Sequence, residues 1–247
     1  AEDSFCNDGN IQMINLTSCA LISLGNIGYV VWWDLIRVLS LIKKQGLQCF
    51  KRLTMHSKIA IWMTVFLILS GTLAFFVLEY NNPLTIGEET LFNKLQISFF
   101  QSVTTRTAGF ATVPQENLTN ASAMVSMIFM FVGGSPVGTA GGVKTVTIAV
   151  LLITASSMIK NKNEITVFNR SIHQKAVKKA ITVFSMSFTI MMVSSILLAL
   201  VTDAPLVDIL YETVSATATV GLTRNLTATL NIWGKLIIIV TMYLGRV

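Results

Sequence analysis

The sequence predicts an all-α membrane protein built from repeated units, each with two membrane helices joined by a short helix and a loop. Hydrophobic residues make up 53% of the chain and charged residues 12%, and the mean hydropathy is +0.67, whereas soluble domains carry about 25% charge. Two uncharged runs, 59–78 and 181–202, are each long enough to cross a hydrocarbon core, which takes roughly 20 helical residues. A short polar motif recurs between the apolar runs, which indicates a repeat.

The distribution of charge orients the chain in its membrane. Basic residues fill two connections, 37–58 and 160–179, whereas acidic residues gather in the segments near the recurring motif. Connections rich in Lys and Arg face the cytoplasm, so we expect these two inside the cell and the loops of the motif outside. The net charge of +6 is accounted for by these connections, and we expect no nucleic-acid partner.

Cysteine and histidine placement argues against an enzyme or a metalloprotein. The three cysteines, Cys6, Cys19 and Cys49, show no spacing typical of a disulfide framework or a zinc site. The two histidines, His56 and His173, fall in the predicted cytoplasmic connections. We therefore expect no catalytic residues and no resident metal site. The chain lacks an initiating methionine and stops inside an apolar run, so we expect an internal piece of a longer protein.

The recurring motif is a Thr/Gly-rich loop with the composition of an ion filter. Segments 104–112 and 216–223, aligned on glycine, both read Thr-x-Thr, then Ala or Val, then Gly, then Phe or Leu, and 4–10 is a poorer echo. Glycine can adopt the φ > 0 conformations that point successive carbonyls one way, and rings of such carbonyls replace the hydration shell of an ion in potassium channels. We predict filter positions at Asn7, Asp8, Gly9, Thr107, Ala108, Gly109, Phe110, Thr219, Val220, Gly221 and Leu222.

The other apolar segments follow in order around these loops. We expect a helix over 11–35 running inwards and a helix over 59–78 returning outwards. Segment 91–104 is too short to span and is predicted as a re-entrant helix that leads into the first complete loop, with an outer-surface amphipathic helix as the alternative. Segment 206–215 is its counterpart before the second loop. Irregular backbone at membrane depth is tolerated only where protein buries it or where it lines a watery cavity.

A second irregular loop interrupts the membrane span between 121–132 and 146–159. Segment 133–144 holds five glycines and one proline. In the interior of a helix, each glycine costs about 1 kcal/mol and the proline about 3 kcal/mol. Loops of this kind mark binding sites or gates in transporters. We predict a gate loop at Gly133, Gly134, Ser135, Pro136, Gly138, Thr139, Gly141, Gly142 and Lys144.

Three cations inside or beside the apolar segments need partners. Lys144 is the cation of the gate loop, and an intramembrane charge is functional by default, with snorkelling to the inner interface as the alternative. Arg246 lies deep in the last apolar run, and we expect the carbonyls of the gate loop to be its partner, with snorkelling to the interface as the alternative. Arg106 lies beside the filter positions, and we expect it to point away from the ion path towards a carboxylate such as Glu116.

These motifs resemble the KtrB branch of the Trk/Ktr/HKT potassium transporter family. The segments 104–110, 133–145 and 27–35 carry the resemblance, which covers essentially the whole chain. It implies four M1-P-loop-M2 units, potassium-channel-like, around a central pore. This chain would then hold the end of the second unit (1–56), the third unit (57–172) and a truncated fourth unit (173–247). It also implies filter glycines at Gly9, Gly109 and Gly221, and a gate loop that Arg246 helps to hold.

The resemblance further implies potassium uptake across the plasma membrane, with K⁺ at the filter carbonyls as the transported ion, Na⁺ as a candidate stimulator and no bound cofactor. The implied partners are membrane lipid, a second copy in a homodimer, and a cytoplasmic ring of KtrA-like nucleotide-binding regulatory subunits. One departure is that the family's second filter usually reads Asn-Ala-Gly-Phe, whereas Asp8 and Asn10 stand here. A Na⁺-coupled secondary transporter with a broken-helix substrate site at 133–143 is the alternative.

Overall fold

The computed structural model is almost entirely helical. It describes residues 12–40, 52–136, 138, 140–161, 166–167 and 170–246. In chain order its helices are α1 (Gln12–Asn26), α2 (Tyr29–Leu39), α4 (Met55–Glu79), α5 (Leu91–Thr104), the 3-10 turn η2 (Gln115–Asn117), α6 (Asn120–Phe131), α7 (Thr145–Ile159), α8 (Gln174–Val201), α9 (Leu206–Thr217), α10 (Leu226–Thr229) and α11 (Ile232–Arg246). Within these ranges the two named strands, β1 (Thr166–Val167) and β2 (Arg170–Ser171), have two residues each and pair antiparallel. The predicted all-helical class is confirmed apart from this pair.

Among the described residues, two helices have the length and apolarity of membrane spans, and the bent pair α1 and α2 would be a third if it counts as one span. α4 has 25 residues and contains the predicted run 59–78, and α8 has 28 and covers the predicted run 181–202 up to Val201. Three helices, α4, α5 and α6, are capped at their N-termini by threonine. In each, the threonine hydroxyl accepts a hydrogen bond from the backbone N–H three residues later, and the capping residues are Thr54, Thr90 and Thr119. Such caps satisfy N–H groups that have no partner within the helix.

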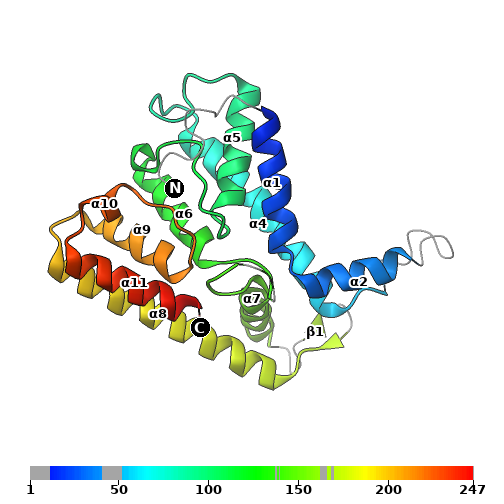
Figure 1. Cartoon of the computed structure of the whole chain (residues 1–247). Coiled ribbons are helices and arrows are strands. Elements are labelled where there is room, and N and C mark those ends of the chain that lie inside the picture. The colour runs from blue at the N-terminus through cyan, green and yellow to red at the C-terminus, as the bar shows by residue number, and fades with distance from the viewer. Residues whose placement is uncertain are drawn as a thin grey trace.

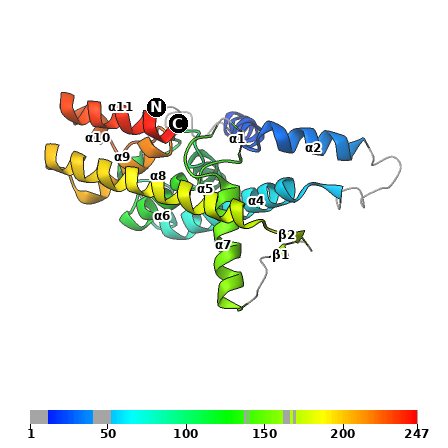
Figure 2. The same ribbon diagram turned by 90° about the horizontal axis from the view of Figure 1, so that it is seen from below.

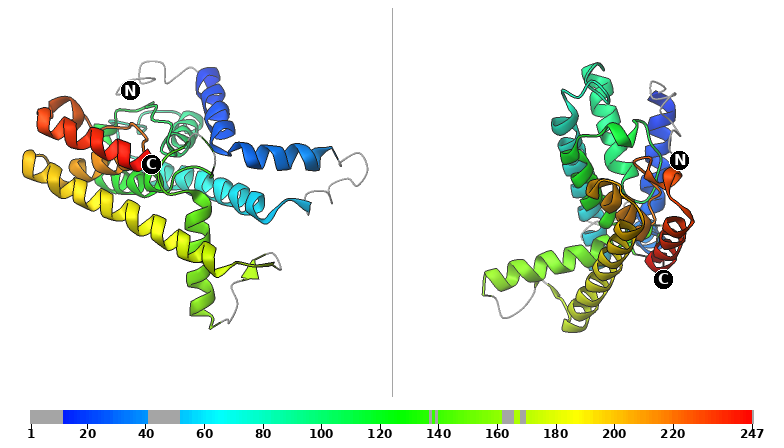
Figure 3. Two further views of the ribbon diagram at one scale, coloured as in Figure 1. Left: turned by 60° about the horizontal axis from the view of Figure 1, so that its bottom comes forward. Right: turned by 90° about the vertical axis from the view of Figure 1, so that its left-hand side faces the viewer.

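The first apolar segment is bent, which corrects the single helix expected over 11–35. α1 and α2 meet at an angle of 93°, and Figures 1 and 3 show α2 leading away from α1. Gly28 at the bend has φ +82°, and the indole Nε1 of Trp32 donates to the carbonyl of Leu24 at 3.0 Å. The indole therefore ties the first turn of α2 to the last turn of α1.

The gate segment does not lie within one straight span. α6 and α7 have nearly the bounds expected for the two flanks, but Figures 1 and 2 show α7 turned away from the direction of α6. α6 packs on α4 and α9, whereas α7 packs on α4 and α8. The irregular segment between them therefore changes the direction of the chain as well as interrupting the helix.

The two short helices lie inside the bundle. α5 spans the predicted 91–104 and packs against α4 and α1, and α9 packs against α6, α8 and α11. The second half of α5 is buried almost throughout, from Phe100 to Thr104, which argues against the alternative of a helix on the outer surface. A core of apolar side chains joins α6, α9 and the loop after α9, and includes Met130, Tyr211, Val214 and Val220.

Candidate functional site

The loop after α5 has a tightly turned backbone that its sequence explains. The amides of Ala108 and Gly109 both donate to the carbonyl of Thr104, at 3.1 and 3.3 Å. The hydroxyl of Thr104 donates to the carbonyl of Phe110 at 2.6 Å and closes the loop from the other side. Thr107 has φ +65° and Gly109 φ +77°. In an extended strand, successive carbonyls point to opposite sides. Positive φ at alternate residues turns successive carbonyls towards the same side.

The loop after α9 has the same pattern at the aligned positions. Thr219 has φ +53° and Gly221 φ +89°. The amide of Val220 donates to the carbonyl of Ser215 at 2.9 Å, and the amide of Gly221 donates to the Ser215 hydroxyl at 3.2 Å. The sequence alignment on glycine therefore corresponds to matched backbone geometry in the two loops.

The two loops are in direct contact through glycine. A Cβ atom built on Gly109 would lie 2.1 Å from the carbonyl oxygen of Val220, which no side chain could tolerate without a shift of backbone. Around Gly221, by contrast, an added Cβ would meet nothing within 4 Å among the described residues. The remaining predicted filter positions, Asn7, Asp8 and Gly9, lie outside the described residues.

The predicted gate loop folds back on itself. The amide of Gly133 donates to the carbonyl of Val143 at 2.9 Å, and the amide of Thr145 donates to the carbonyl of Gly134 at 3.0 Å. Val132 and Val143 form an isolated parallel bridge. The two arms of the loop are thus held side by side, and Thr139 of the predicted set lies outside the described residues.

The gate loop packs against the loop after α9. A Cβ atom on Gly141 would lie 1.9 Å from the Thr219 hydroxyl and 2.8 Å from the carbonyl of Ala218. Gly142, with φ +64°, would place a Cβ 3.2 Å from the Cα of Ala218. The structure therefore brings together one predicted filter loop and the predicted gate loop.

The three cations behave differently from one another. Lys144 donates to the carbonyl of Ala140 in its own loop. Arg246 is exposed at the end of α11, and its neighbour Gly245 approaches the carbonyl of Thr217 so closely that a Cβ would lie 2.0 Å from it. The end of α11 therefore lies against the end of α9. The role of Arg246 as partner of the gate loop stays a prediction.

The partner expected for Arg106 is wrong. Arg106 is 2% exposed, and its guanidinium donates to the hydroxyl of Thr64 on α4 at 3.4 Å. The Glu116 carboxylate instead accepts from Asn225 Nδ2 at 3.0 Å. The expectation rested on closeness in sequence, whereas packing of α5 on α4 turns Arg106 inwards.

Buried polar contacts behind the loops were not predicted. Gln101 Nε2 donates to Gln115 Oε1 at 2.7 Å, and the Tyr211 hydroxyl donates to the same oxygen at 3.0 Å. This set joins α5, the segment after its loop, and α9. Polar residues within apolar helices are expensive unless paired, and that signal in the sequence could have singled out Gln101, whereas Gln115 lies in the polar connection after the loop and gave no such signal.

The loop after α9 has a carboxylate contact of its own. Glu212 is 4% exposed and accepts hydrogen bonds from the hydroxyls of Thr223 and Thr227, the latter at 2.7 Å. Arg224, between those threonines, pairs with Asp208 at 2.7 Å and also donates to the carbonyl of Glu116 at 3.3 Å. The segments that follow the two loops are therefore fixed to α9 and to each other.

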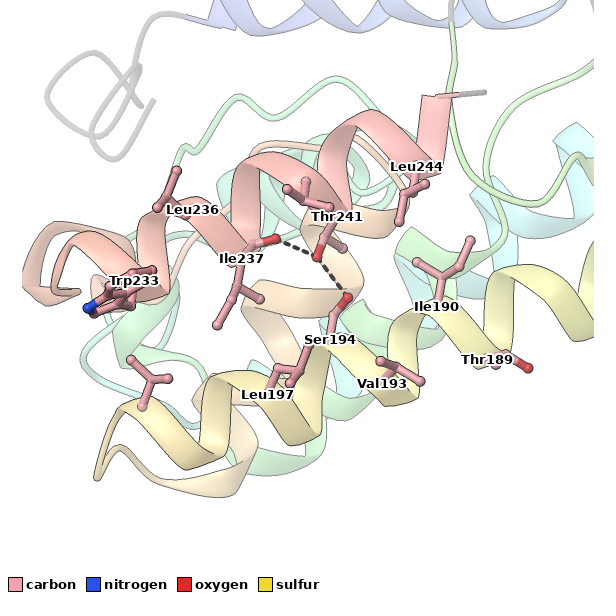
Figure 4. Close-up of a pocket in the computed structure, with 12 residues that line it drawn as sticks. Thr189, Ile190, Val193, Ser194, Leu197, Trp233, Leu236, Ile237, Thr241 and Leu244 are labelled. Atoms are coloured by element: carbon pink, nitrogen blue, oxygen red, sulfur yellow. Dashed lines mark hydrogen bonds between the residues drawn. The ribbon is translucent and has the colours of Figure 1, made fainter.

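An apolar groove lies away from these loops. It has a volume of about 550 Å³ and runs between α8 and α11, where Thr241 donates to Ser194 at 2.7 Å (Figure 4). Its lining is mostly aliphatic, with Trp233 at one end.

Across the described ranges no group of three His, Cys, Asp or Glu side chains is placed to hold a metal ion. The groups available for a cation at the loops are carbonyls and hydroxyls.

The chain is similar to known transport proteins over nearly all its length. Residues 3–247 match the family model described as "TrkH: Cation transport protein". The potassium/sodium uptake protein NtpJ of Enterococcus hirae is 36% identical over 264 residues, which cover 100% of this chain and 56% of that protein. Ktr system potassium uptake protein B of Bacillus subtilis is 35% identical, covering 95% of this chain and 51% of that protein. The Vibrio alginolyticus protein of the same description is 34% identical, covering 99% and 51%.

The fold is shared with a solved transporter structure. The potassium transporter TrkH from Vibrio parahaemolyticus matches with a TM-score of 0.74 and 16% identity, covering 95% of this chain and 50% of that chain. At this identity the likeness concerns the fold alone. The chain spans about half the length of the curated relatives it matches.

Proposed function

This chain belongs to the TrkH family of cation transport proteins, and we propose that it forms part of the pore of a potassium uptake protein in the plasma membrane. The observation that carries the proposal is the pair of matched loops, with positive φ at Thr107 and Gly109 and again at Thr219 and Gly221. Gly109 lies directly against Val220. Two neighbouring loops of the same geometry are the arrangement expected of adjacent walls of a filter.

In this proposal the repeated unit consists of a membrane helix, a re-entrant helix with its filter loop, and a second membrane helix. The third unit comprises α4, α5 and the pair α6 and α7, and the fourth comprises α8, α9 and α11. The second unit would supply α1 and α2, after a filter at Asn7, Asp8 and Gly9. K⁺ sheds its water as it enters and is bound by backbone carbonyls and threonine hydroxyls. Buried hydrogen bonds that the side chains of Gln115 and Glu212 accept hold the segments behind these carbonyls.

The gate in this proposal is the loop 133–144, which crosses the path directly beside the filter. Its contact with Ala218 and Thr219 supports a position in line with the ion path. Lys144 holds the loop to itself through Ala140, and Arg246 at the end of α11 stabilises the closed form. The loop has to leave its place against α9 for ions to pass.

The complete protein would be a homodimer within the lipid bilayer, seated on a cytoplasmic ring of nucleotide-binding regulatory subunits. Its filter loops face outwards, and its basic connections 37–58 and 160–179 face the cytoplasm. The similarity to a protein described as a potassium/sodium uptake protein supports Na⁺ as a second transported or stimulating ion. It also favours, as a second candidate function, a Na⁺-coupled secondary transporter with its substrate site at the gate loop.

The test is rubidium and sodium uptake by the full-length protein in cells that lack their own potassium uptake systems. Gly109→Ser should lower the ratio of rubidium to sodium uptake about tenfold or more, because the added side chain overlaps the Val220 carbonyl. Gly234→Ala on α11 is the matched control, since its Cβ meets only side chains, at 3.1 Å or more. An unchanged ratio in the Gly109 variant refutes the filter. Uptake no faster than an alternating-access carrier favours the second candidate.

A further inference from the structure

Asn26, the last residue of α1, contacts both irregular loops. Its side-chain Nδ2 donates to the carbonyl of Arg106 at 2.8 Å, immediately before the filter positions of the third unit. Its backbone carbonyl accepts from the amide of Ser135 in the gate loop at 3.0 Å. Asn26 is 5% exposed, so both bonds are sheltered from water. One residue therefore binds the filter loop with its side chain and the gate loop with its main chain.

The end of α1 provides this contact because its helix stops at the bend. Carbonyls in the last turn of a helix have no partner within the helix, and the first arm of the gate loop packs against them. A Cβ on Gly134 would lie 3.2 Å from the Asn26 carbonyl oxygen, and one on Gly138 would lie 3.4 Å from the carbonyl oxygens of both Asn26 and Gly25. The gate loop thus follows the surface of this helix end closely.

The position of Asn26 is fixed from the other side of the bend. The Trp32 indole donates to the carbonyl of Leu24, and the Trp32 amide donates to the carbonyl of Gly28 at 3.3 Å. The bond to Leu24 spans Asn26 and ties the end of α1 to the start of α2.

We propose that Asn26 is a positioning residue that couples the gate loop to the filter loop. When loop 133–144 stays against α1, the Asn26 amide holds the Arg106 carbonyl and the filter keeps its selective width. When the loop moves away, the Asn26 carbonyl loses its bond to Ser135, the Asn26 side chain turns about its fixed backbone, and the Arg106 carbonyl is released. Such coupling is reciprocal, so the state of the filter also biases the gate. The inference rests on the proposed function, because it assigns a link between a filter and a gate.

The test is a double-mutant cycle on the full-length protein, with the ratio of rubidium to sodium uptake as the measured quantity. The two changes are Asn26→Ala, which removes the amide donor, and deletion of residues 136–140, which removes the middle of the gate loop. Each alone should lower the ratio about threefold to tenfold, the size of one buried hydrogen bond. The two together should lower it no further than the stronger single change, because both release the same carbonyl.

Two further variants separate coupling from general damage. Asn26→Leu keeps most of the volume of the side chain and removes the amide donor without adding a charge, so it should reproduce the alanine result if the alanine variant does not reach the membrane. Asn93→Ala is the matched control, because it removes one asparagine hydrogen bond, 2.9 Å to Glu89, at the start of α5 away from both loops. That control should leave the ratio and the effect of the deletion unchanged.

The outcomes distinguish this inference from the proposed function. Effects of the two changes that multiply independently overturn the coupling and leave filter and gate intact. A deletion that raises uptake without altering the ratio also overturns the coupling. A deletion that changes neither uptake nor ratio overturns the gate itself, and the coupling with it.

Discussion

Substitution of Glu212 tests how much its hydrogen bonds to Thr223 and Thr227 stabilise the predicted filter loop after α9. Its carboxylate accepts hydrogen bonds from Thr223 and Thr227 while 4% exposed. Hydrogen bonds to a charged group contribute about 1.5–3 kcal/mol and neutral ones about 0.5–1.5 kcal/mol. Glu212→Gln keeps the shape but leaves one acceptor oxygen where the carboxylate has two, so one threonine donates to a neutral oxygen and the other has to turn its hydroxyl to accept. We expect this variant to lower the free energy of unfolding by about 1–2 kcal/mol.

Glu212→Ala should cost more, because it leaves both threonine hydroxyls without an acceptor. The site adjoins a cavity of about 200 Å³ that also borders Gly221, so water can satisfy part of that loss. We therefore expect about 2–4 kcal/mol for the alanine variant, from a lost buried side chain and two weakened hydrogen bonds.

The assay combines thermal unfolding of the purified full-length protein in detergent with the ratio of rubidium to sodium uptake. Both quantities should decrease from the native protein to the glutamine variant and again to the alanine variant. Asp203→Asn, an exposed acid just after α8, serves as the control and should change neither. Glutamine and alanine variants that match this control would refute the reasoning, because the carboxylate would then hold nothing.

Two further predictions concern contacts between elements. Gly141→Ala should raise resting uptake by the full-length protein several-fold, because an added Cβ would lie 1.9 Å from the Thr219 hydroxyl and 2.8 Å from the Ala218 carbonyl and would force the gate loop away from both. Uptake that stays at the native level would refute a gating role for this contact. Tyr211→Phe should lower the free energy of unfolding by about 0.5–1.5 kcal/mol. It removes the hydrogen bond to Gln115, but Gln101 still donates to the same oxygen. A loss above about 3 kcal/mol would contradict a role limited to this hydrogen bond.

The elements governed by local pattern were predictable. The bounds of α5 follow from a threonine cap at Thr90, an apolar stripe and a loop of small residues, all of which are visible in sequence. The irregular segment 133–144 follows from its glycines and proline. The likeness of the two filter loops was visible as an alignment, and their matched positive φ values give it a geometric basis.

Features that depend on packing between distant segments were not predictable. Residues 26–29 read Asn-Ile-Gly-Tyr within an otherwise apolar run, an interruption too slight in hydropathy to predict the 93° bend. The inward turn of Arg106 depends on Thr64, which is 42 residues away in the sequence. The contacts of Asn26 were not predictable because its partners, Arg106 and Ser135, belong to two segments that are distant in the sequence.

The structure also changes what the glycines of the gate loop mean. In the sequence they indicated an interruption of a helix, which suggests a loose segment. In the structure Gly133 lies so near the carbonyl of Gly141 that a Cβ would be 2.1 Å away, and Gly141 in turn lies against Thr219. Backbone that approaches other backbone this closely is packed, and packed interiors switch between discrete arrangements and do not deform continuously. If segment 133–144 acts as the proposed gate, this packing predicts that it moves as one body away from the contacts with Asn26 and Thr219.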